Sequence, residues 1–311
     1  MNYFINIGII VICVLGLWGG ATIIVESASR IARKLGLSEL VIGLTIVAIA
    51  TSAPEFAVTV SAAIKNQYSI SVGNVIGSNI FNLGIILGLV AIFGGLKTTP
   101  KLVYRDGMIL LSTGILLLIF FRDLKLEFYE GAILFSLLVI YVVYLVRSKQ
   151  EVDEEVPTGE YNWKDIPKLI IGAVIIIASS HFFVEAASSL ARLWGISEWL
   201  IGITIVAAGT SAPELATSIV AVAKGRHGLS AGNLIGSDIF NMLGVLGLAA
   251  MLRTLGIQKD EYNSIIYMVF TLFILLFLMR SRWRLTKREG ILILFIGFLR
   301  WFLDFYHINL F

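Results

Sequence analysis

Long apolar runs, separated by short polar connections, follow one another along the whole chain. In windows of about 20 residues, the length that crosses ~30 Å of hydrocarbon, ten segments are apolar enough to be membrane helices. These candidate spans are residues 3–25, 40–64, 70–95, 104–121, 127–146, 166–190, 199–223, 229–252, 262–279 and 289–307. Apolar residues make up 58% of the 311 positions and charged residues 14%. A soluble domain is nearer half apolar and a quarter charged, so the pattern predicts an all-α membrane protein with ten transmembrane helices.

The first apolar run is expected to be a membrane span and not a cleavable signal peptide. No Lys or Arg precedes it, and residues 13–20 offer no convincing cleavage site. Cys13 is the only cysteine, so no internal disulfide can form.

Basic residues are concentrated in alternate connections between the spans. Seventeen of the 24 Lys and Arg residues lie in or beside odd-numbered connections, and six in even-numbered ones. Because short basic loops stay in the cytoplasm, we expect both termini to lie outside. The last connection, with Arg280, Arg282, Arg284, Lys287 and Arg288, then lies inside. Between two spans such a run anchors topology, so we expect no nucleic-acid partner.

One repeat is used twice. Shifted by 159 positions, residues 36–82 match residues 195–241 at 26 of 47 positions without a gap. Each copy contains five spans, so the second must enter the membrane from the opposite side. The sequence therefore predicts two inverted five-helix repeats, 1–147 with its motif at 36–84 and 166–311 with its motif at 195–244.

The halves are joined by a charged linker, residues 148–165, which we expect in the cytoplasm. Its acidic residues lack the spacing and glycine turn of a calcium-binding loop. The segment is also too short to fold as a regulatory domain. We interpret it as a solvated connection.

Each motif places a proline and a carboxylate in the middle of an apolar span, as Thr-Ser-Ala-Pro-Glu at 51–55 and at 210–214. A charged carboxylate at the bilayer centre costs at least ~2.5 kcal/mol. The prolines also free backbone carbonyls one turn earlier, and such backbone is tolerated in a membrane where it lines a polar cavity. Hard cations such as calcium and sodium prefer oxygen ligands. Glu55 and Glu214 would together neutralise one divalent cation or hold two or more monovalent ones, which suits an exchanger.

A second motif, Gly-Ser-x-x-x-Asn, also occurs in both halves. Ser78 and Asn82 lie four residues apart and share a helix face, as do Ser237 and Asn241. Such residues can also cap helices or hold them together. Because the pair recurs in both halves, we favour ion ligation.

These two motifs resemble the paired alpha-repeats of the sodium/calcium exchanger family in its compact microbial form, over nearly the whole chain. Proton/calcium exchangers typically carry Gly-Asn-x-x-Glu without the proline, so the motif is similar to the sodium-coupled branch. The resemblance implies a potassium-independent, electrogenic antiporter of the plasma membrane that exchanges three Na⁺ for each Ca²⁺. It implies no cofactor, and no partner besides these ions and the bilayer; we expect a monomer.

In that family the motif acids coordinate both ions, with hydroxyls, amides and carbonyls completing the sites. Carried over, the implied metal-site residues are Glu55, Glu214, Thr51, Ser52, Thr210, Ser211, Ala48, Ala207, Ser78, Asn82, Ser237 and Asn241. Spans one and six, with fewer polar residues, are expected to slide across this site and alternate its access.

The chain departs from the family pattern at three positions. Ala50 replaces a glycine that Gly209 keeps in the second half, so we expect the first half to bend less freely. Asn241 stands where potassium-dependent relatives carry an aspartate, which argues against potassium transport. Asp238 replaces the Asn79 of the first half. It either supplies the missing charge as a metal-site residue or points toward a vestibule, and the sequence leaves both open.

Other polar residues favour structural roles. Glu26 and Glu185 correspond across the repeats, and we expect ion pairs with Arg30 and Arg192 in place of a role at the ion entrance. His181 could relay protons, but a lone histidine near a helix end more often makes a structural hydrogen bond.

A proton/calcium exchanger using the same two glutamates is the main alternative function. We do not expect an enzyme, because no histidine or cysteine lies near the glutamates to act as a nucleophile or base. A channel would not need two inverted closed halves, and a purely structural protein would not need mirrored buried acids.

Overall fold

In the computed structural model, residues 3–148, 162–196, 205 and 207–305 are described. Seven helices in these ranges are long and apolar enough to cross a membrane, and a pair bent by 51°, Glu39–Thr51 with Ala53–Ile64, makes up to eight. The protein is therefore an all-helical membrane protein. Parts of the predicted spans 199–223 and 289–307, and most of the linker, lie outside the described residues.

The two halves of the chain form matching series of elements. The first comprises α1 (Tyr3–Leu35), α2 (Glu39–Ile42), η1 (Gly43–Val47), α3 (Ala48–Thr51), α4 (Ala53–Ile64), α5 (Tyr68–Phe81), η2 (Asn82–Ile86), α6 (Leu87–Gly94), β1 (Leu96–Lys97), η3 (Leu102–Gly107), α7 (Met108–Phe120), η4 (Phe121–Asp123), β2 (Lys125–Leu126) and α8 (Phe128–Arg147). The second comprises α9 (Asp165–Leu193), α11 (Ala207–Thr210), α12 (Ala212–Ala223), α13 (His227–Ile239), η6 (Phe240–Val245), α14 (Leu246–Leu252), β3 (Leu255–Gly256), α15 (Lys259–Arg282), β4 (Arg284–Leu285) and α16 (Lys287–Phe305).

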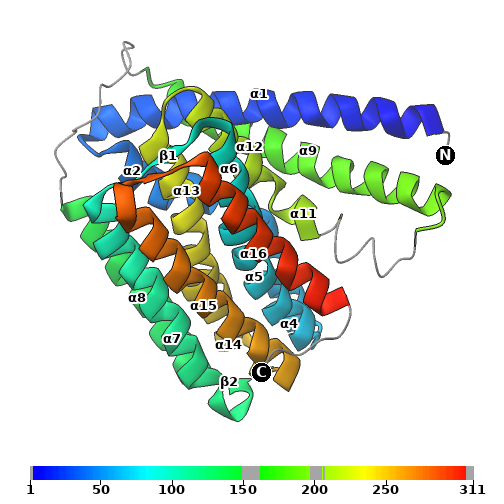
Figure 1. Ribbon diagram of the computed structural model, residues 1–311, viewed down its shortest axis with the longest axis vertical. Helices are drawn as coiled ribbons and strands as arrows, with labels where there is room; N and C mark the ends of the chain where they lie inside the picture. The colour runs from blue at the N-terminus through cyan, green and yellow to red at the C-terminus, as the bar shows by residue number, and fades with distance from the viewer. Residues whose placement is uncertain (1–2, 149–161, 197–204, 206, 306–311) are drawn as a thin grey trace.

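The long helices α1 and α9 lie side by side and run antiparallel across the rest of the bundle (Figure 1). Near one end of the pair, Asn6 Nδ2 donates to Ser189 Oγ at 3.0 Å. Near the other end, Arg30 Nε lies 2.9 Å from Asp165 Oδ1. The helices approach closely at Gly20, where a Cβ would lie 3.0 Å from the carbonyl oxygen of Gly172. Small residues permit this approach, and α1 continues ten residues beyond the predicted span, to Leu35.

Two short antiparallel ribbons tie the halves together at opposite ends of the bundle, where β1 and β2 lie (Figure 1). One pairs β1 with β4 and the other pairs β2 with β3. Adding 159 to the residue numbers of β1 gives those of β3, and adding 159 to those of β2 gives those of β4. The two ribbons are therefore equivalent in the two repeats. In both, a leucine pair is fully buried: Leu96 with Leu285, and Leu126 with Leu255.

The helix beginnings follow from local sequence. α8 and α15 each start with a reciprocal capping box, Glu127 with Glu130 and Gln258 with Glu261. The proline of each Thr-Ser-Ala-Pro-Glu motif lies in the first turn of α4 or α12, where its missing N–H would have no helical partner. Asn82 opens the π-helical segment η2, and Asn241 lies at the start of η6. Such segments occur frequently at functional sites.

Candidate ion-binding site

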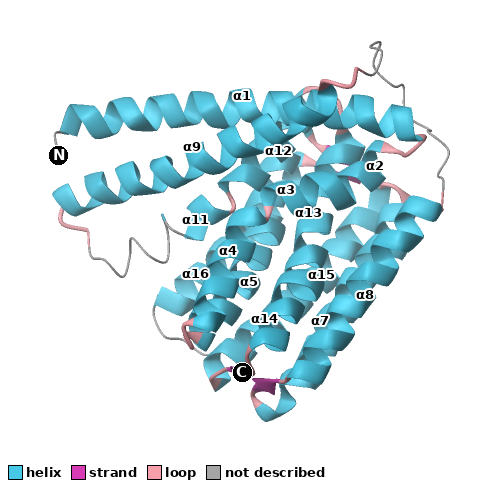
Figure 2. Ribbon diagram, turned by 180° about the vertical axis from the view of Figure 1, so that it is seen from behind, coloured by secondary structure: helices cyan, strands magenta, loops and turns pink. Residues whose placement is uncertain are grey.

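The breaks in the two motif helices place their glutamates in the interior. Ser52 interrupts the helix between α3 and α4, and Ser211 does so between α11 and α12. Glu55 and Glu214 lie in the first turns that follow, where the helix dipole favours negative charge. Figure 2 shows α3 and α12 meeting α13 in the middle of the fold.

The glutamates are bonded reciprocally across the two halves. Ser52 Oγ donates to Glu214 Oε1 at 2.9 Å, and Ser211 Oγ donates to Glu55 Oε1 at 3.2 Å. All four side chains are fully buried. Residues far apart in sequence but equivalent in the repeats therefore meet in one site.

Hydroxyls of the second motif lie beside the same carboxylates. Ser237 Oγ lies 3.4 Å from both Glu214 Oε1 and Thr51 Oγ1. Ser78 is also buried and lies near the Glu55 carboxylate. The structure thus brings the first-motif acids and the second-motif hydroxyls together, and their role as ion ligands stays a prediction.

The amides form a second reciprocal set next to the glutamates. Asn82 Nδ2 donates to Asp238 Oδ1 at 2.9 Å, and Asn241 Nδ2 donates to Asn79 Oδ1 at 3.1 Å. Asn79 Nδ2 also donates to the Asp238 carbonyl oxygen at 3.2 Å. These four side chains are fully buried. We call this set together with the two glutamates and Thr51, Ser52, Ser78, Ser211 and Ser237 the cage.

Several cage oxygens have no hydrogen-bond partner in the described structure. They are Glu55 Oε2, Glu214 Oε2, Asn82 Oδ1, Asp238 Oδ2 and Asn241 Oδ1. A buried, unpaired acceptor costs free energy, and all five are hard oxygen acceptors of the kind that Na⁺ and Ca²⁺ bind. The cage therefore has the chemistry of a cation site.

Sequence reasoning missed the residues that hold the glutamate backbones. Asn74 Nδ2 donates to Thr59 Oγ1 at 2.9 Å and to the Glu55 carbonyl oxygen at 3.2 Å. Asn233 repeats this arrangement with Ser218 and Glu214. The signal was available, since an asparagine recurs at the same position of both repeats, three residues before the glycine of the second motif.

The carbonyls expected to be free of helical bonds are partly occupied. The Ala48 oxygen accepts the Ser52 backbone N–H at 2.9 Å, so it keeps a helical bond. The Gly209 oxygen accepts a hydrogen bond from Ser180 of α9. Ala207 and Thr210 are the first and last residues of α11, and a ligand role for them and for Ala48 remains a prediction.

The two sides of the cage differ in packing. A Cβ at Gly236 would lie 2.6 Å from Leu44 Cα, and one at Gly232 would lie 2.5 Å from the Leu40 carbonyl oxygen. Among the described residues, no atom lies within 4 Å of such a Cβ at the equivalent Gly77 or Gly73, and both glycines are exposed. Residues 199 and 203, which correspond to Leu40 and Leu44, lie outside the described residues. Within the described part of the chain, the cage is therefore sealed along α13 and more open along α5.

The surface acids pair differently from the prediction. Glu26 binds Lys224 while Arg30 binds Asp165, so the expected Glu26–Arg30 pair is wrong. Glu185 lies 3.4 Å from His181, and both side chains are exposed. His181 therefore lies at an exposed position beside a carboxylate.

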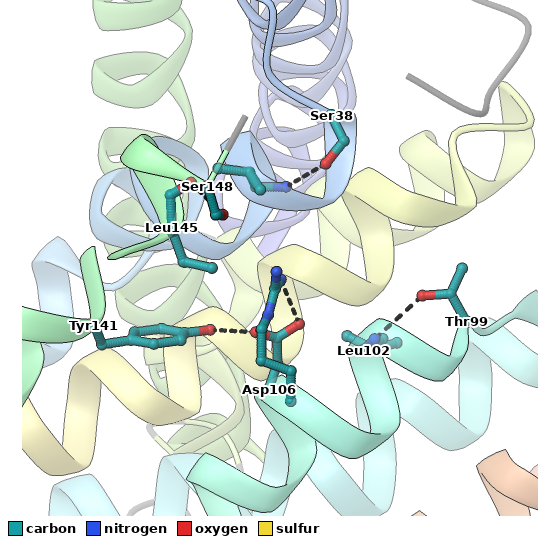
Figure 3. Close-up of polar contacts among 9 residues, drawn as sticks. Ser38, Thr99, Leu102, Asp106, Tyr141, Leu145 and Ser148 are labelled. Carbon is teal, nitrogen blue, oxygen red and sulfur yellow. Dashed lines mark hydrogen bonds and ion pairs between the residues drawn. The ribbon is translucent and has the colours of Figure 1, made fainter. Parts of the chain in front are cut away.

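A further buried polar cluster lies apart from the cage. Arg105 makes two hydrogen bonds to the carboxylate of Asp106, and Tyr141 of α8 donates to the same carboxylate at 2.8 Å (Figure 3). Because Asp106 is fully buried and its oxygens are satisfied, this cluster joins η3 to α8 as a structural element.

Comparison with known proteins agrees with the geometry of the cage. The family model described as "Sodium/calcium exchanger protein" matches residues 5–147 and 166–303. The chain belongs to the sodium/calcium exchanger family. It is therefore a multi-pass membrane antiporter that exchanges calcium against another cation, and a transporter instead of an enzyme.

Relatives match this exchanger over almost its full length. CaxA of Alkalimonas amylolytica is 35% identical over 95% of the chain and 96% of its own length. The sodium/calcium exchanger MaX1 of Methanosarcina acetivorans is 31% identical over 95% of the chain and 97% of its own length. The structure of the sodium-calcium exchanger NCX_Mj soaked without Na⁺ and Ca²⁺ matches with a TM-score of 0.84 at 29% identity, covering 96% of this chain and 98% of that one.

Proposed function

We propose that this exchanger couples sodium influx to calcium efflux at the cage, with three Na⁺ for each Ca²⁺ and without potassium. The observation that supports this most directly is the reciprocal Ser–Glu bonding, which brings two buried carboxylates and their unpartnered oxygens together. Two glutamates match the charge of one Ca²⁺, so sodium and calcium would compete for one set of oxygens. The relatives named as sodium/calcium exchangers support sodium as the coupling ion.

The proposed architecture is ten spans in two inverted repeats, acting as a monomer in the plasma membrane with both termini outside. The corresponding helices α1 and α9 run antiparallel, and the corresponding ribbons lie at opposite ends of the bundle. Both features are expected when equivalent elements have opposite orientations in the membrane.

This orientation also assigns the open side of the cage. The basic connections place Lys224 and the β1–β4 ribbon inside, and Lys65 and the β2–β3 ribbon outside. Lys224 binds Glu26, although both are exposed, whereas no ion pair among the described residues joins the corresponding Lys65 and Glu185. The arrangement therefore corresponds to a state closed toward the cytoplasm and open toward the outside.

The test is calcium-45 uptake into proteoliposomes loaded with sodium and diluted into sodium-free, potassium-free buffer at clamped potential. Glu55→Gln and Glu214→Gln each remove one carboxylate while keeping its size, and we expect both to abolish uptake. Asp123→Asn, which removes an exposed acid outside the cage, should retain wild-type uptake.

The same assay separates the coupling ions. Uptake that requires internal sodium supports the proposal. Uptake that ignores sodium but follows an imposed proton gradient would contradict sodium coupling and assign the same cage to proton/calcium exchange. A reversal potential measured with both gradients present reports the stoichiometry.

A further inference from the structure

Asp238 breaks the symmetry of the cage. The offset of 159 relates it to Asn79, so one of the two equivalent positions carries a charge and the other does not. Both side chains are fully buried, and both accept a hydrogen bond from the amide of the other repeat.

The charge of Asp238 is not needed for this hydrogen bond. Asn82 Nδ2 donates to Asp238 Oδ1 at 2.9 Å, and Asn241 Nδ2 donates to the neutral Asn79 Oδ1 at 3.1 Å. An asparagine therefore orients its amide partner in the same way. The carboxylate must have another use, because burying a charge without a partner is costly.

The surroundings of Asp238 favour a cation as that partner. Among the ion pairs of the described residues, none includes Asp238. Its Oδ2 has no hydrogen-bond partner, and neither have the neighbouring Oδ1 atoms of Asn82 and Asn241. Asn82 bonds to Asp238, and Asn241 bonds to Asn79, which in turn bonds to the Asp238 carbonyl oxygen. The three buried oxygens therefore lie within one part of the cage.

We propose that Asp238 is the third anionic group of the ion site and that its charge makes the calcium-loaded cage carry one net negative charge across the membrane. When a bound cation keeps all three ionised, Glu55, Glu214 and Asp238 together carry three negative charges. Ca²⁺ leaves one of them uncompensated, whereas three Na⁺ neutralise all three. The sodium part of this count rests on the proposed function. The membrane potential then acts on the calcium-carrying step and leaves the sodium-carrying step nearly insensitive.

Calcium/calcium exchange isolates the step in question. Proteoliposomes with equal calcium on both sides and no sodium are clamped with potassium and valinomycin, and calcium-45 exchange is followed from −100 to +100 mV. One charge crossing 100 mV changes the free energy by about 2.3 kcal/mol, so we expect wild-type exchange to vary several-fold over this range. Asp238→Asn keeps the acceptor for Asn82 and makes the calcium-loaded cage neutral, so its exchange should be flat with voltage.

A charge-swapped variant and a control complete the experiment. Asp238→Asn combined with Asn241→Asp restores the third carboxylate three positions away and should restore the voltage dependence, which also covers the case in which Asp238→Asn alone is inactive. Asp123→Asn should behave like wild type. Wild-type exchange that is flat with voltage, or an Asp238→Asn variant with the wild-type dependence, would overturn the proposal. Failure of sodium coupling would show only in the sodium-gradient assay, because calcium/calcium exchange needs no sodium.

Discussion

Lys224 Nζ lies 2.5 Å from Glu26 Oε1 and joins the loop after α12 to helix α1. The offset of 159 relates this pair to Lys65 and Glu185, which are both exposed and belong to the loop after α4 and to helix α9. In the described structure α1 packs along α12, while α9 makes no comparable contact with α4. In an inverted-repeat exchanger, the state that faces the opposite side is expected to have the reverse arrangement. Lys65 would then bind Glu185 with α9 packed on α4, and Lys224 would be separated from Glu26.

We therefore expect Lys65→Gln and Lys224→Gln to shift the two states in opposite directions. Lys65→Gln should favour the present state and Lys224→Gln the opposite one. Partly exposed pairs contribute about 0.2–1 kcal/mol, so the ratio of states should change by at most about five-fold. The readout is the rate at which an impermeant thiol reagent labels Gly77→Cys in a Cys13→Ala background, since Gly77 is exposed on the open side. Shifts in the same direction for both variants would refute the exchange of ion pairs.

The glycine pair Gly77 and Gly236 offers a second test of alternation. Gly236→Ala places a Cβ 2.6 Å from Leu44 Cα and should destabilise the described state by about 1–3 kcal/mol. Gly77→Ala meets no atom of the described residues within 4 Å, so the thermal unfolding midpoint should stay near wild type. If the opposite state packs Gly77 as this one packs Gly236, Gly77→Ala should nevertheless slow transport. Wild-type transport by Gly77→Ala would count against the mirrored packing.

The reciprocal serines should contribute equally to calcium binding. Ser52→Ala and Ser211→Ala each remove a hydroxyl that donates to a buried carboxylate. Hydrogen bonds to charged groups are worth about 1.5–3 kcal/mol, and the same oxygen is a candidate ion ligand, so we expect apparent calcium affinity to fall about tenfold or more in each. Ser61→Ala, on the exposed face of α4, is the matched control. An unchanged affinity in either cage variant would remove that serine from the site.

The Asp106 cluster should affect stability without affecting the ion site. Tyr141→Phe removes one hydrogen bond to a buried carboxylate that Arg105 still satisfies (Figure 3). The expected loss is about 1–2 kcal/mol in the free energy of unfolding, with unchanged calcium transport per folded molecule. A change in apparent calcium affinity would show instead that η3 and α8 are coupled to the cage.

The sequence was sufficient to find most of the cage because comparing the two copies of the repeat shows which polar residues recur. Glu55 and Glu214 recur at one offset in apolar spans, and a buried charge has few physical explanations. The predicted span ends are mostly correct within a few residues, since they depend on length and hydropathy. Asn74 and Asn233 were missed because their recurrence in both repeats does not by itself show which backbone carbonyl an amide side chain will bond.

Other features depend on tertiary packing that the pattern of residues does not encode. The helix α1 continues to Leu35 with Ile31 and Ala32 buried, and Arg30 of these last turns binds Asp165 of α9. Arg30 was expected to bind Glu26 because both lie near the end of the first span, but α9 brings Asp165 to it instead. The open side of the cage depends on the conformational state. Because the two repeats are nearly equal in sequence, the sequence does not show which side is open.

The central claim is that sodium and calcium occupy one cage built from both halves. It is tested most directly by equilibrium binding of calcium-45 to the purified exchanger at increasing sodium concentration, with Glu55→Gln and Glu214→Gln in parallel. The account predicts competitive displacement of calcium by sodium that is steeper than first order, and loss of calcium binding in each variant. Calcium binding that sodium does not displace, or that persists in both variants, would contradict it.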